Sequence, residues 1–488
     1  MFFNQIKFLF RDAIFYVVSH MTPFLADPDK DFTRRRKLPP ETLISFLVSQ
    51  GASSTGNELD DFFDFHCDAP SPSAINQQRD KLKPQVLEEV CHQLLLSLLK
   101  LDPPSPYRFL AADGSSFSFF STPKLAPDEY FVSGGHSAKG FYSLHLNALY
   151  DLNSHTYMDA VIQPVHFKDE FKAFCTMVDR LETLEGTSDI FIADRGYCSY
   201  NNMAHVLEKK QFFLFRSKDV NVRGIAGHLP LPKQGSFDLC LDIVIKRSHS
   251  RKIAASGDYV TFVGAASTFD FLPYGSLDTY TLPVRVVRFP LDDGSYECIM
   301  TNLPADEFTM EDIKRLYFSR WGIETSFRRL KYTIGLSSFH SYKPEFIKQE
   351  IWAKLIAYNL TETVINHTVV ETRKNTKHSY KVNFTEAAHI CRVFFRLHSR
   401  KNPADVMPLL RRKLIPVRKE RSFPRLQTAH LKQDIYEDTF PVRRGSVLFQ
   451  IKNDLKWTVF GQALFKTLLR YTSTHFVCIC IPQSWGTI

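Results

Sequence analysis

Two short apolar runs that each end in an aspartate constrain the fold of this chain more than any other feature. FLAAD covers residues 109–113 and IFIAD covers residues 190–194. Runs of this length and composition predict buried β-strands. We expect Asp113 at or near the end of the first strand and Asp194 at the end of the second, where each chain turns. Side by side, the strands would aim both carboxylates into one cleft, although either aspartate alone is ordinary turn or helix-cap chemistry.

Composition narrows the class of protein that can contain these strands. The chain has 488 residues, and its 44% hydrophobic and 23% charged content excludes wholesale disorder. Lysine and arginine outnumber aspartate and glutamate by 61 to 52, and the net charge of +9 favours a polyanionic partner without proving one. Basic residues cluster over 34–37, 314–331 and 411–425, although a charge run is usually a solvated face.

No segment has the sequence of a membrane span or a secretion signal. Residues 1–20 are apolar, but Lys7 and Arg11 interrupt them with the spacing of an amphipathic helix. No run approaches the roughly 20 uncharged residues that cross a bilayer. The nine cysteines lack zinc-ligand spacing, which favours reduced thiols. We therefore expect a soluble, cytoplasmic protein without a membrane partner.

The hydrophobic period changes along the chain and divides it into five parts. Spacings of three and four residues predict helices near both ends, and short apolar runs predict strands between them. The parts are a helical region over 1–104, the first part of an α/β core over 105–210, a β-strand insertion over 211–303, the second part of the core over 304–375, and a helical, basic region over 376–488.

The first part of the core has an informative order of elements. Strands are predicted over 107–117, 143–152 and 157–165, a helix over 167–184, and a buried strand within 189–197 that ends in a turn. The order strand, strand, strand, helix, strand predicts an α/β domain, which the all-β insertion then interrupts.

A short polar helix is predicted within residues 70–84, before the core. It could lie on DNA, and a solvated face is the other reading. Its polar side chains include Gln77, Gln78, Arg79 and Lys81.

A third acidic residue lies in the helix predicted over 310–331. One polar stripe of that helix, with members spaced by 3, 4 and 7 residues, contains Tyr317, Arg320, Glu324 and Lys331. An apolar side for packing contains Trp321, Ile323, Phe327 and Leu330. Taken alone, the stripe is typical of a surface helix with ion pairs such as Arg320 with Glu324.

The conjunction of Glu324 with the two aspartates favours a different interpretation. Three carboxylates that converge from two strands and a helix bind hard divalent cations, and two such ions can clamp the attacking and leaving oxygens of a phosphodiester. Without metal, close carboxylates would raise one another's pKa. The side chains that would face the substrate phosphates are Tyr317, Arg320 and Lys331.

These residues resemble the DDE transposases of bacterial insertion sequences, specifically the insertion-sequence-four group. The resemblance is carried by Asp113 in AADGSS, Asp194 in ADRGY and the Tyr-x2-Arg-x3-Glu-x6-Lys pattern, and HLNALYDL, IQP and DEFKAF are also similar. It implies an α/β fold with an RNase H-like catalytic core interrupted by the β-rich insertion. It also implies an N-terminal DNA-binding region and a C-terminal region for dimerisation or DNA contact.

The resemblance implies cut-and-paste transposition, with cleavage of transposon ends and strand transfer into target DNA. Asp113, Asp194 and Glu324 would be catalytic and would hold two Mg²⁺ ions, with Mn²⁺ as a substitute. The implied partners are double-stranded DNA, as inverted-repeat ends and as target, and a second copy of the chain when DNA is bound. The implied location is the nucleoid of a prokaryotic cytosol.

Further DNA contacts are expected outside the stripe. Some relatives flip a base onto a tryptophan before the signature helix, but no tryptophan occurs between Asp194 and Trp321. Tyr296 is the best substitute, and the use of a DNA hairpin stays open. Other candidates for phosphate contact are Arg216, Lys218 and Arg328. For Arg216 and Lys218, a solvated turn is an equally consistent interpretation.

Two other functions stay open. A stand-alone RNase H-like nuclease would use the same carboxylates, and a catalytically inactive, transposase-derived protein would only bind DNA. Clustered intact carboxylates argue against the second, because a protein freed from catalysis has no physical reason to keep them. Residues after about 440 do not resemble the family and have no assigned role.

Overall fold

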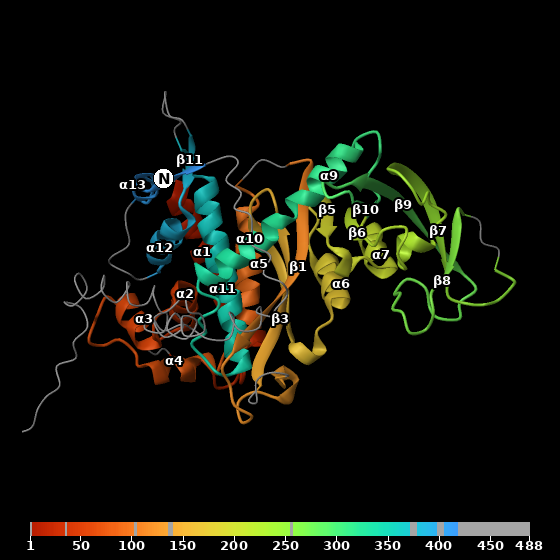
Figure 1. Cartoon of the computed structure of the whole chain (residues 1–488). Helices are drawn as coiled ribbons and strands as arrows, with labels where there is room; N and C mark the ends of the chain where they lie inside the picture. The colour runs from red at the N-terminus through yellow and green to blue at the C-terminus, as the bar shows by residue number, and fades with distance from the viewer. Residues whose placement is uncertain are drawn as a thin grey trace, which may run out of the picture. The chain divides into compact units, whose positions relative to one another are not determined.

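Figure 1 shows the computed structural model of the chain, a mixed α/β fold built around one large sheet. It describes residues 2–34, 37–101, 105–134, 140–253, 257–370, 378–397 and 405–417, which belong to one compact unit, Met1–Arg425. The residues after about 440, and parts of the basic clusters at 34–37 and 411–425, lie outside the described residues.

Within the described residues, a group of helices precedes the sheet. The first helix buries Phe3, Ile6, Phe10 and Ile14 at spacings of three and four residues, so one apolar stripe faces the core. These helices are α1 (Phe2–Ser19), α2 (Pro40–Ser49), α3 (Thr55–Phe62), α4 (Pro72–Arg79) and α5 (Gln85–Leu98).

The strands of the core form one ten-stranded sheet. Its order is β2-β3-β1-β5-β6-β10-β9-β7-β8, with β4 also paired to β3. β1 pairs antiparallel with β3 and parallel with β5, so the sheet is mixed. The strands are β1 (Tyr107–Phe119), β2 (Phe131–Val132), β3 (Phe141–Asp151), β4 (Thr156–Pro164), β5 (Ser188–Ala193), β6 (Phe212–Ser217), β7 (Phe237–Lys246), β8 (Tyr259–Phe262), β9 (Thr279–Pro290) and β10 (Tyr296–Thr301).

The strands of residues 211–303 do not make a separate sheet. β6 pairs parallel with β5, and β10, β9, β7 and β8 continue outward from β6. These strands therefore extend the sheet that contains both aspartates.

The remaining helices cover the sheet or follow it along the chain. They are α6 (Glu170–Arg180), α7 (Tyr200–Glu208), α8 (Ile225–His228), α9 (Met310–Ser319), α10 (Trp321–Tyr332), α11 (Pro344–Asn366), α12 (Phe384–Phe394) and α13 (Met407–Arg412). A separate two-stranded antiparallel sheet pairs β11 (Ser379–Val382) with β12 (Leu414–Val417) across the segment that contains α12 and α13.

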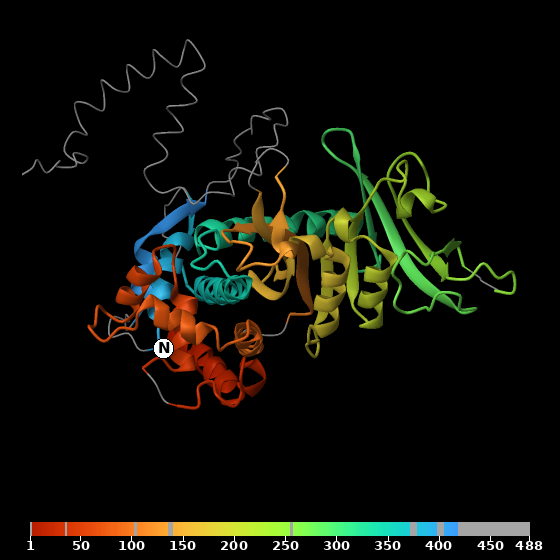
Figure 2. The ribbon, with the colours of Figure 1, turned by 90° about the horizontal axis from the view of Figure 1, so that it is seen from below.

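Alternate residues of β5 and β6 face opposite layers. The rings of Phe191 and Phe215 have centroids 5.9 and 5.5 Å from that of Phe174 in α6. Ile190 and Ile192 instead join a second apolar cluster with residues of α9. Figure 2 shows α6 and α7 on one side of these strands and α9 on the other. Because side chains alternate across a strand, an unbroken apolar run such as IFIA is required when both faces are covered.

α11 is a largely buried helix of 23 residues that packs against α2, α5, α12 and β4. The polar helix α4 docks onto it, since Arg79 donates to Gln349 Oε1 at 3.0 Å and to Glu350 Oε1 at 3.0 Å. Gln78 and Arg79 are buried. Both earlier interpretations of these two side chains, as DNA contacts or as a solvated face, are therefore wrong, because a distant helix supplies partners that the local sequence does not show.

Among the residues that the structure describes, no helix combines the length and the apolarity needed to cross a bilayer.

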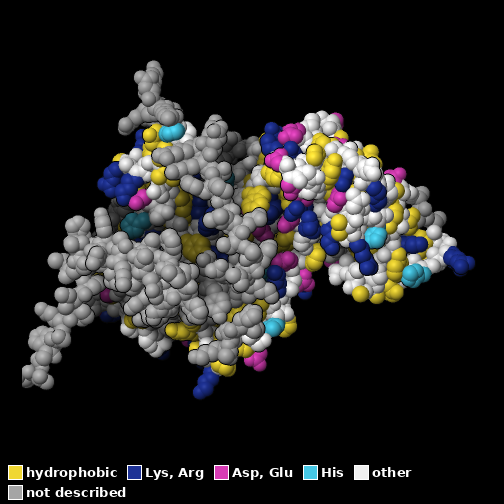
Figure 3. All heavy atoms as spheres, in the orientation of Figure 1, with side chains coloured by type: hydrophobic (Ala, Val, Ile, Leu, Met, Phe, Trp, Pro, Cys, Tyr) yellow, Lys and Arg dark blue, Asp and Glu magenta, His cyan; other side chains and the backbone are white. Residues whose placement is uncertain are grey.

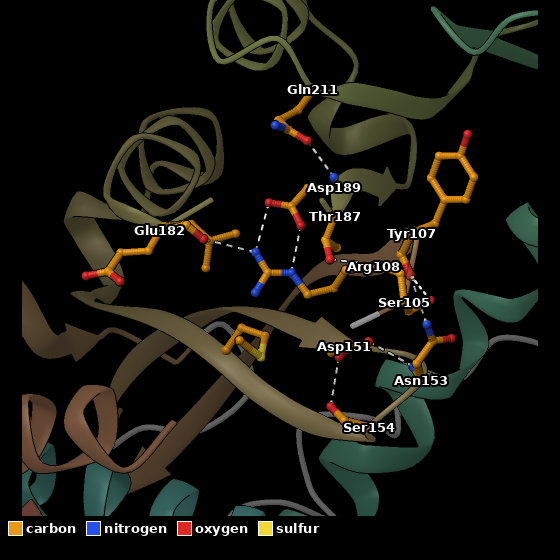
Figure 4. A network of polar contacts seen from close by, with 12 residues as sticks. Ser105, Tyr107, Arg108, Asp151, Asn153, Ser154, Glu182, Thr187, Asp189 and Gln211 are labelled. Atoms are coloured by element: carbon orange, nitrogen blue, oxygen red, sulfur yellow. Dashed lines mark hydrogen bonds and ion pairs between the residues drawn. The ribbon is translucent and has the colours of Figure 1, made fainter. Parts of the chain in front are cut away.

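A buried ion pair fixes the register of β1 against β5 (Figure 4). Arg108 and Asp189 are direct register partners, and the guanidinium donates from Nε to Oδ1 at 2.7 Å and from Nη2 to Oδ2 at 2.9 Å. The Asp189 N–H donates in turn to Gln211 Oε1 at 2.5 Å. A two-pronged charged contact of this kind specifies geometry as well as energy.

We expect Asp189→Ala to lower the free energy of unfolding by about 3–5 kcal/mol, because it leaves a buried guanidinium without its counter-charge. Chemical denaturation of the metal-free protein measures this. Asp68→Ala removes one partner of an exposed pair with Lys37, and it should change stability little. Equal effects of the two substitutions would contradict the role given to Asp189.

Candidate active site

Asp113 lies inside a strand rather than at its end. β1 continues to Phe119, because its antiparallel pairing with β3 extends through Ser115 and Ser116. The predicted turn at Asp113-Gly114 is therefore wrong. The parallel pairing with β5, however, ends at Ala112. Asp113 is thus the first residue of β1 beyond β5, and its Oδ1 accepts a hydrogen bond from Gly114 N at 2.8 Å.

Asp194 follows β5 directly, as predicted. It caps a short 3-10 helix, Arg195–Tyr197, and its Oδ1 accepts from Arg195 N at 2.6 Å. Because Ala112 is paired with Ala193, the two aspartates occupy the next equivalent positions of neighbouring parallel strands. The structure therefore brings the two predicted carboxylates together at the carboxyl end of β5.

The predicted helix of residues 310–331 is present as two helices, α9 and α10, which meet at Arg320. Arg320 itself keeps α-helical backbone angles, so the polar stripe continues across the junction. Gly322 follows at a close approach to the β3–β4 connection, where an added Cβ would lie 2.9 Å from Leu152 Cδ2. A glycine lets α10 approach the sheet at this point.

Arg320 connects two of the three predicted carboxylates. Its Nη2 donates to Glu324 Oε1 at 3.0 Å, and its Nη1 lies 3.6 Å from Asp113 Oδ2. The side chain is only 5% exposed, and its Nε has no hydrogen-bond partner among the described residues. The guanidinium therefore neutralises carboxylates that would otherwise repel each other.

A second arginine and a tyrosine contact Asp194. Arg216 Nη1 lies 3.5 Å from Asp194 Oδ1, and the Tyr317 hydroxyl donates to the same oxygen at 3.3 Å. Arg216 is held from behind by Glu297, whose buried carboxylate accepts from Nε at 2.5 Å. Glu297 was not anticipated, because nothing in the local sequence of β10 marks it as a partner of β6.

Burial and charge act differently on the two aspartates. Burial raises the pKa of the Asp113 carboxyl to about 6; the Gly114 N–H and Arg320 oppose this, and the charges of Glu324 and Asp194 add to it. Burial also acts on Asp194, but the Arg195 N–H and the two arginines outweigh it, so its pKa lies below the ordinary value. Asp113 is thus within electrostatic reach of both Asp194 and Glu324.

A group of polar side chains beside the aspartates was not predicted from the sequence as part of the site. The Tyr197 hydroxyl donates to Asn147 Oδ1 at 3.3 Å, and His145 lies 3.2 Å from Glu170. Buried His145 and Asn147 on the otherwise apolar β3 were the available signal, since polar side chains in a buried strand need partners.

The three predicted carboxylates do not form a compact donor cluster in this structure. Among the described residues, the group of three or more His, Cys, Asp or Glu side chains whose ligand atoms all lie within 4.8 Å of one another is the exposed trio His66, Cys67 and Asp68. Asp113, Asp194 and Glu324 are spread more widely, with Arg320 between two of them. Their oxygen donors nevertheless suit hard divalent cations.

Comparison with known proteins identifies the family. The family model described as "Transposase DDE domain" matches residues 104–360, which is more than half of the chain. The chain belongs to the DDE transposases.

Individual relatives agree with this membership. The transposase InsG of insertion sequence IS4 from Escherichia coli K12 is 22% identical over 428 residues, with 82% of this chain and 88% of the relative covered. The transposase of IS421 from Escherichia coli is 35% identical over 82 residues, which is 17% of this chain. The chain spans about a fifth, 22%, of the length of the curated relatives that match at this identity. The predicted resemblance to the insertion-sequence-four group is confirmed.

A solved structure is also similar to the transposase. The synaptic complex of the piggyBac transposase with hairpin DNA superimposes with a TM-score of 0.45 at 10% identity, and 83% of each chain is covered.

The other residues predicted to contact DNA differ in burial and in their neighbours. Lys331 Nζ lies 5.0 Å from the ring centroid of Phe117 on β1, so the last turn of α10 stays beside the Asp113 strand. Arg328 and Lys218 are exposed. Trp321 is 54% exposed, which corrects its predicted packing role, whereas Ile323, Phe327 and Leu330 are buried.

Tyr296 is separated from the carboxylates. Arg288 covers its ring at 3.8 Å from the centroid, and successive residues of a strand face opposite ways. Tyr296 therefore lies on the face of β10 opposite Glu297, which contacts Arg216. Figure 3 shows basic and acidic side chains interspersed over the described part of the face that carries α9, so no single-sign patch marks the site.

The raised pKa of Asp113 predicts a pH dependence of stability in the metal-free protein. In the folded state the Asp113 carboxyl stays protonated up to about pH 6, whereas in the unfolded chain it ionises near pH 3.8. Ionisation of Asp113 therefore destabilises the fold as pH rises through this window, by up to about 3 kcal/mol. We expect Asp113→Asn to remove that loss in denaturation curves measured with EDTA between pH 4 and 7.

Asp194→Asn is the matched comparison, because the pKa of Asp194 is lowered. Its ionised form stabilises the fold above its unfolded pKa, so the substitution should give no gain at neutral pH. The same gain in both variants would contradict the assigned electrostatics.

Proposed function

We propose that this transposase cleaves transposon-end DNA in a Mg²⁺-dependent reaction and transfers the strands into target DNA. The observation that carries the proposal is the convergence of Asp113, Asp194 and Glu324 around Arg320, at the edge where β1 passes the end of β5. Membership of the DDE transposases supports the same reaction.

The metal ions would be held by the oxygen atoms of Asp113, Asp194 and Glu324. Two Mg²⁺ ions, or Mn²⁺ in their place, supply positive charge to the phosphodiester and lower the pKa of an attacking water. The protein's part is to present the carboxylates ionised and to bind the DNA phosphates. In the metal-free protein, Arg320 and Arg216 pair with the carboxylates. When cations neutralise the carboxylates, the two guanidinium groups would be free to contact DNA phosphates beside the cut.

The strand order supports an RNase H-like core. β3 pairs antiparallel with both β4 and β1. On the other edge of β1, β5 pairs parallel with β1, and β6 pairs parallel with β5. We assign the catalytic core to these five strands with α9 and α10, and the insertion to the strands between β6 and α9. Residues 1–104 are proposed to bind DNA, and residues 376–488 to serve dimerisation or DNA contact.

The proposed partners are double-stranded DNA, as inverted-repeat ends and as target, and a second copy of the chain on that DNA. The proposed location is the nucleoid-associated cytosol. A stand-alone nuclease is the second candidate, because the same carboxylates would cut without joining.

Substitution of the carboxylates tests the reaction. Asp113→Asn, Asp194→Asn and Glu324→Gln should each lower Mg²⁺-dependent cleavage of inverted-repeat DNA by at least about 10²-fold, because each removes charge from the developing transition state. Binding of the same DNA, measured by gel shift, should persist. Asp306→Asn, which changes an exposed acid, is the control. Wild-type cleavage by any of the three variants would refute the assignment.

Product mapping separates the two candidate functions. A transposase joins the cut ends to a target plasmid, whereas a nuclease releases cut ends alone.

Arg320 offers an independent prediction about metal binding. A guanidinium 3.0 Å from Glu324 and 3.6 Å from Asp113 repels a cation placed between them. We therefore expect Arg320→Ala to bind Mn²⁺ about tenfold more tightly in a titration followed by electron paramagnetic resonance. The same variant should cleave DNA poorly, because the phosphate contact is lost. Weaker Mn²⁺ binding would show that Arg320 instead organises the carboxylates.

A further inference from the structure

His145 and Glu170 form a pair beside the catalytic carboxylates that no part of the proposed reaction uses. His145 lies on β3 with its side chain 3% exposed, and its Nδ1 is 3.0 Å from Ser116 Oγ on β1. Its Nε2 lies 3.2 Å from Glu170 Oε1. Glu170 begins α6, and Lys168 Nζ lies 2.8 Å from the same oxygen.

The histidine packs directly against the backbone that follows Asp113. A Cβ added to Gly114 would lie 2.4 Å from His145 Nε2 and 2.9 Å from its Cε1. No side chain fits at residue 114 while His145 keeps its place. Gly114 also donates its N–H to Asp113, so the position of the imidazole bears on the orientation of that carboxylate.

The glutamate contacts the turn that follows Asp194. Its second oxygen, Oε2, lies 3.5 Å from the place of a Cβ on Gly196, two residues after the aspartate. Tyr197 follows Gly196 in the chain. Burial raises the pKa of the Tyr197 hydroxyl, and the charges of Glu170 and Asp113 raise it further. The pair therefore lies beside the backbone that follows both aspartates, and its two residues come from two further elements of the fold, β3 and α6.

The charge on Glu170 is secured by its neighbours. The contact with His145, reinforced by Lys168 and opposed by burial, lowers the pKa of Glu170 to about 2. The carboxylate is therefore ionised throughout the neutral range.

We propose that His145 and Glu170 are positioning residues for the catalytic centre, which hold the backbone after Asp113 and Asp194 so that both carboxylates can bind one cation. The inference rests on the proposed function only for the identity of the catalytic carboxylates. Residues that orient metal ligands typically contribute about 10- to 100-fold to metal affinity.

Mn²⁺ binding to the full chain without DNA is the primary measurement, and thermal unfolding checks that each variant is folded. Glu170→Gln keeps the shape of the side chain and removes its charge, so we expect Mn²⁺ affinity to fall by about 10- to 100-fold. Glu185→Gln, which removes an exposed charge, is the matched control and should bind as the wild type does. Unchanged affinity in a folded Glu170→Gln variant would overturn the proposal.

A double-mutant cycle tests the contact between Gly114 and His145. Gly114→Ala forces the imidazole away, and His145→Ala removes it, so each should weaken Mn²⁺ binding. The double variant should lose less than the sum of the two single losses, because the new methyl group enters the vacated space and meets only Asn147 Oδ1, 3.1 Å from the Cβ position. Additive losses would overturn the proposed route through His145.

A conservative replacement separates positioning from simple loss of packing. His145→Gln places an amide where Nε2 approaches Glu170, whereas His145→Asn reaches only toward Ser116. We expect the glutamine variant to keep affinity within about threefold of wild type and the asparagine variant to lose it. Equal losses in both folded variants would overturn the role of the Glu170 contact.

DNA cleavage distinguishes this inference from the proposed function. If the wild type binds Mn²⁺ more tightly than Glu170→Gln does but cuts no inverted-repeat DNA, the proposed function fails and the inference stands. If the wild type and Glu170→Gln cut equally well with equal Mn²⁺ affinity, the inference fails and the function stands.

Discussion

The parallel register of β1 and β5 is the constraint on which the active-site geometry depends. Arg108 and Asp189 are paired in that register, and Asp113 and Asp194 each lie five residues further along the same two strands. A slip of one residue would turn the aspartates to opposite faces and would separate the buried guanidinium from its carboxylate. The ion pair between Arg108 and Asp189 therefore favours the register of β1 and β5 that brings Asp113 and Asp194 together.

Charge balance explains how the carboxylates stay together without a cation. Arg320 and Arg216 face four carboxylates, those of Asp113, Asp194, Glu324 and Glu297, which leaves an excess of two negative charges when all are ionised. Burial is the main cause of the raised pKa of Asp113, and the negative charges of Glu324 and Asp194 add to it. The site is thus assembled with arginine in the metal-free state, and it keeps the charge that a divalent cation would neutralise.

Local sequence patterns located the core strands, the two aspartates and the polar stripe, because each depends on residues close in the chain. They failed where a distant segment decides. Asp113 is inside a strand because β3 extends the pairing, and Arg79 is buried because α11 supplies its partners. The placement of Trp321 in solvent likewise depends on what packs against α10.

Gly114 shows how one dipeptide can have two physical explanations. Asp-Gly is typical of a turn, where glycine supplies a left-handed conformation. In this fold Gly114 continues a strand, and it is not among the residues with positive φ. The absence of a side chain is needed instead for space, since the His145 ring occupies the place of the missing Cβ. A glycine that serves packing depends on its neighbour, so its substitution should cost less once that neighbour is removed, whereas a turn glycine would be required equally in either background.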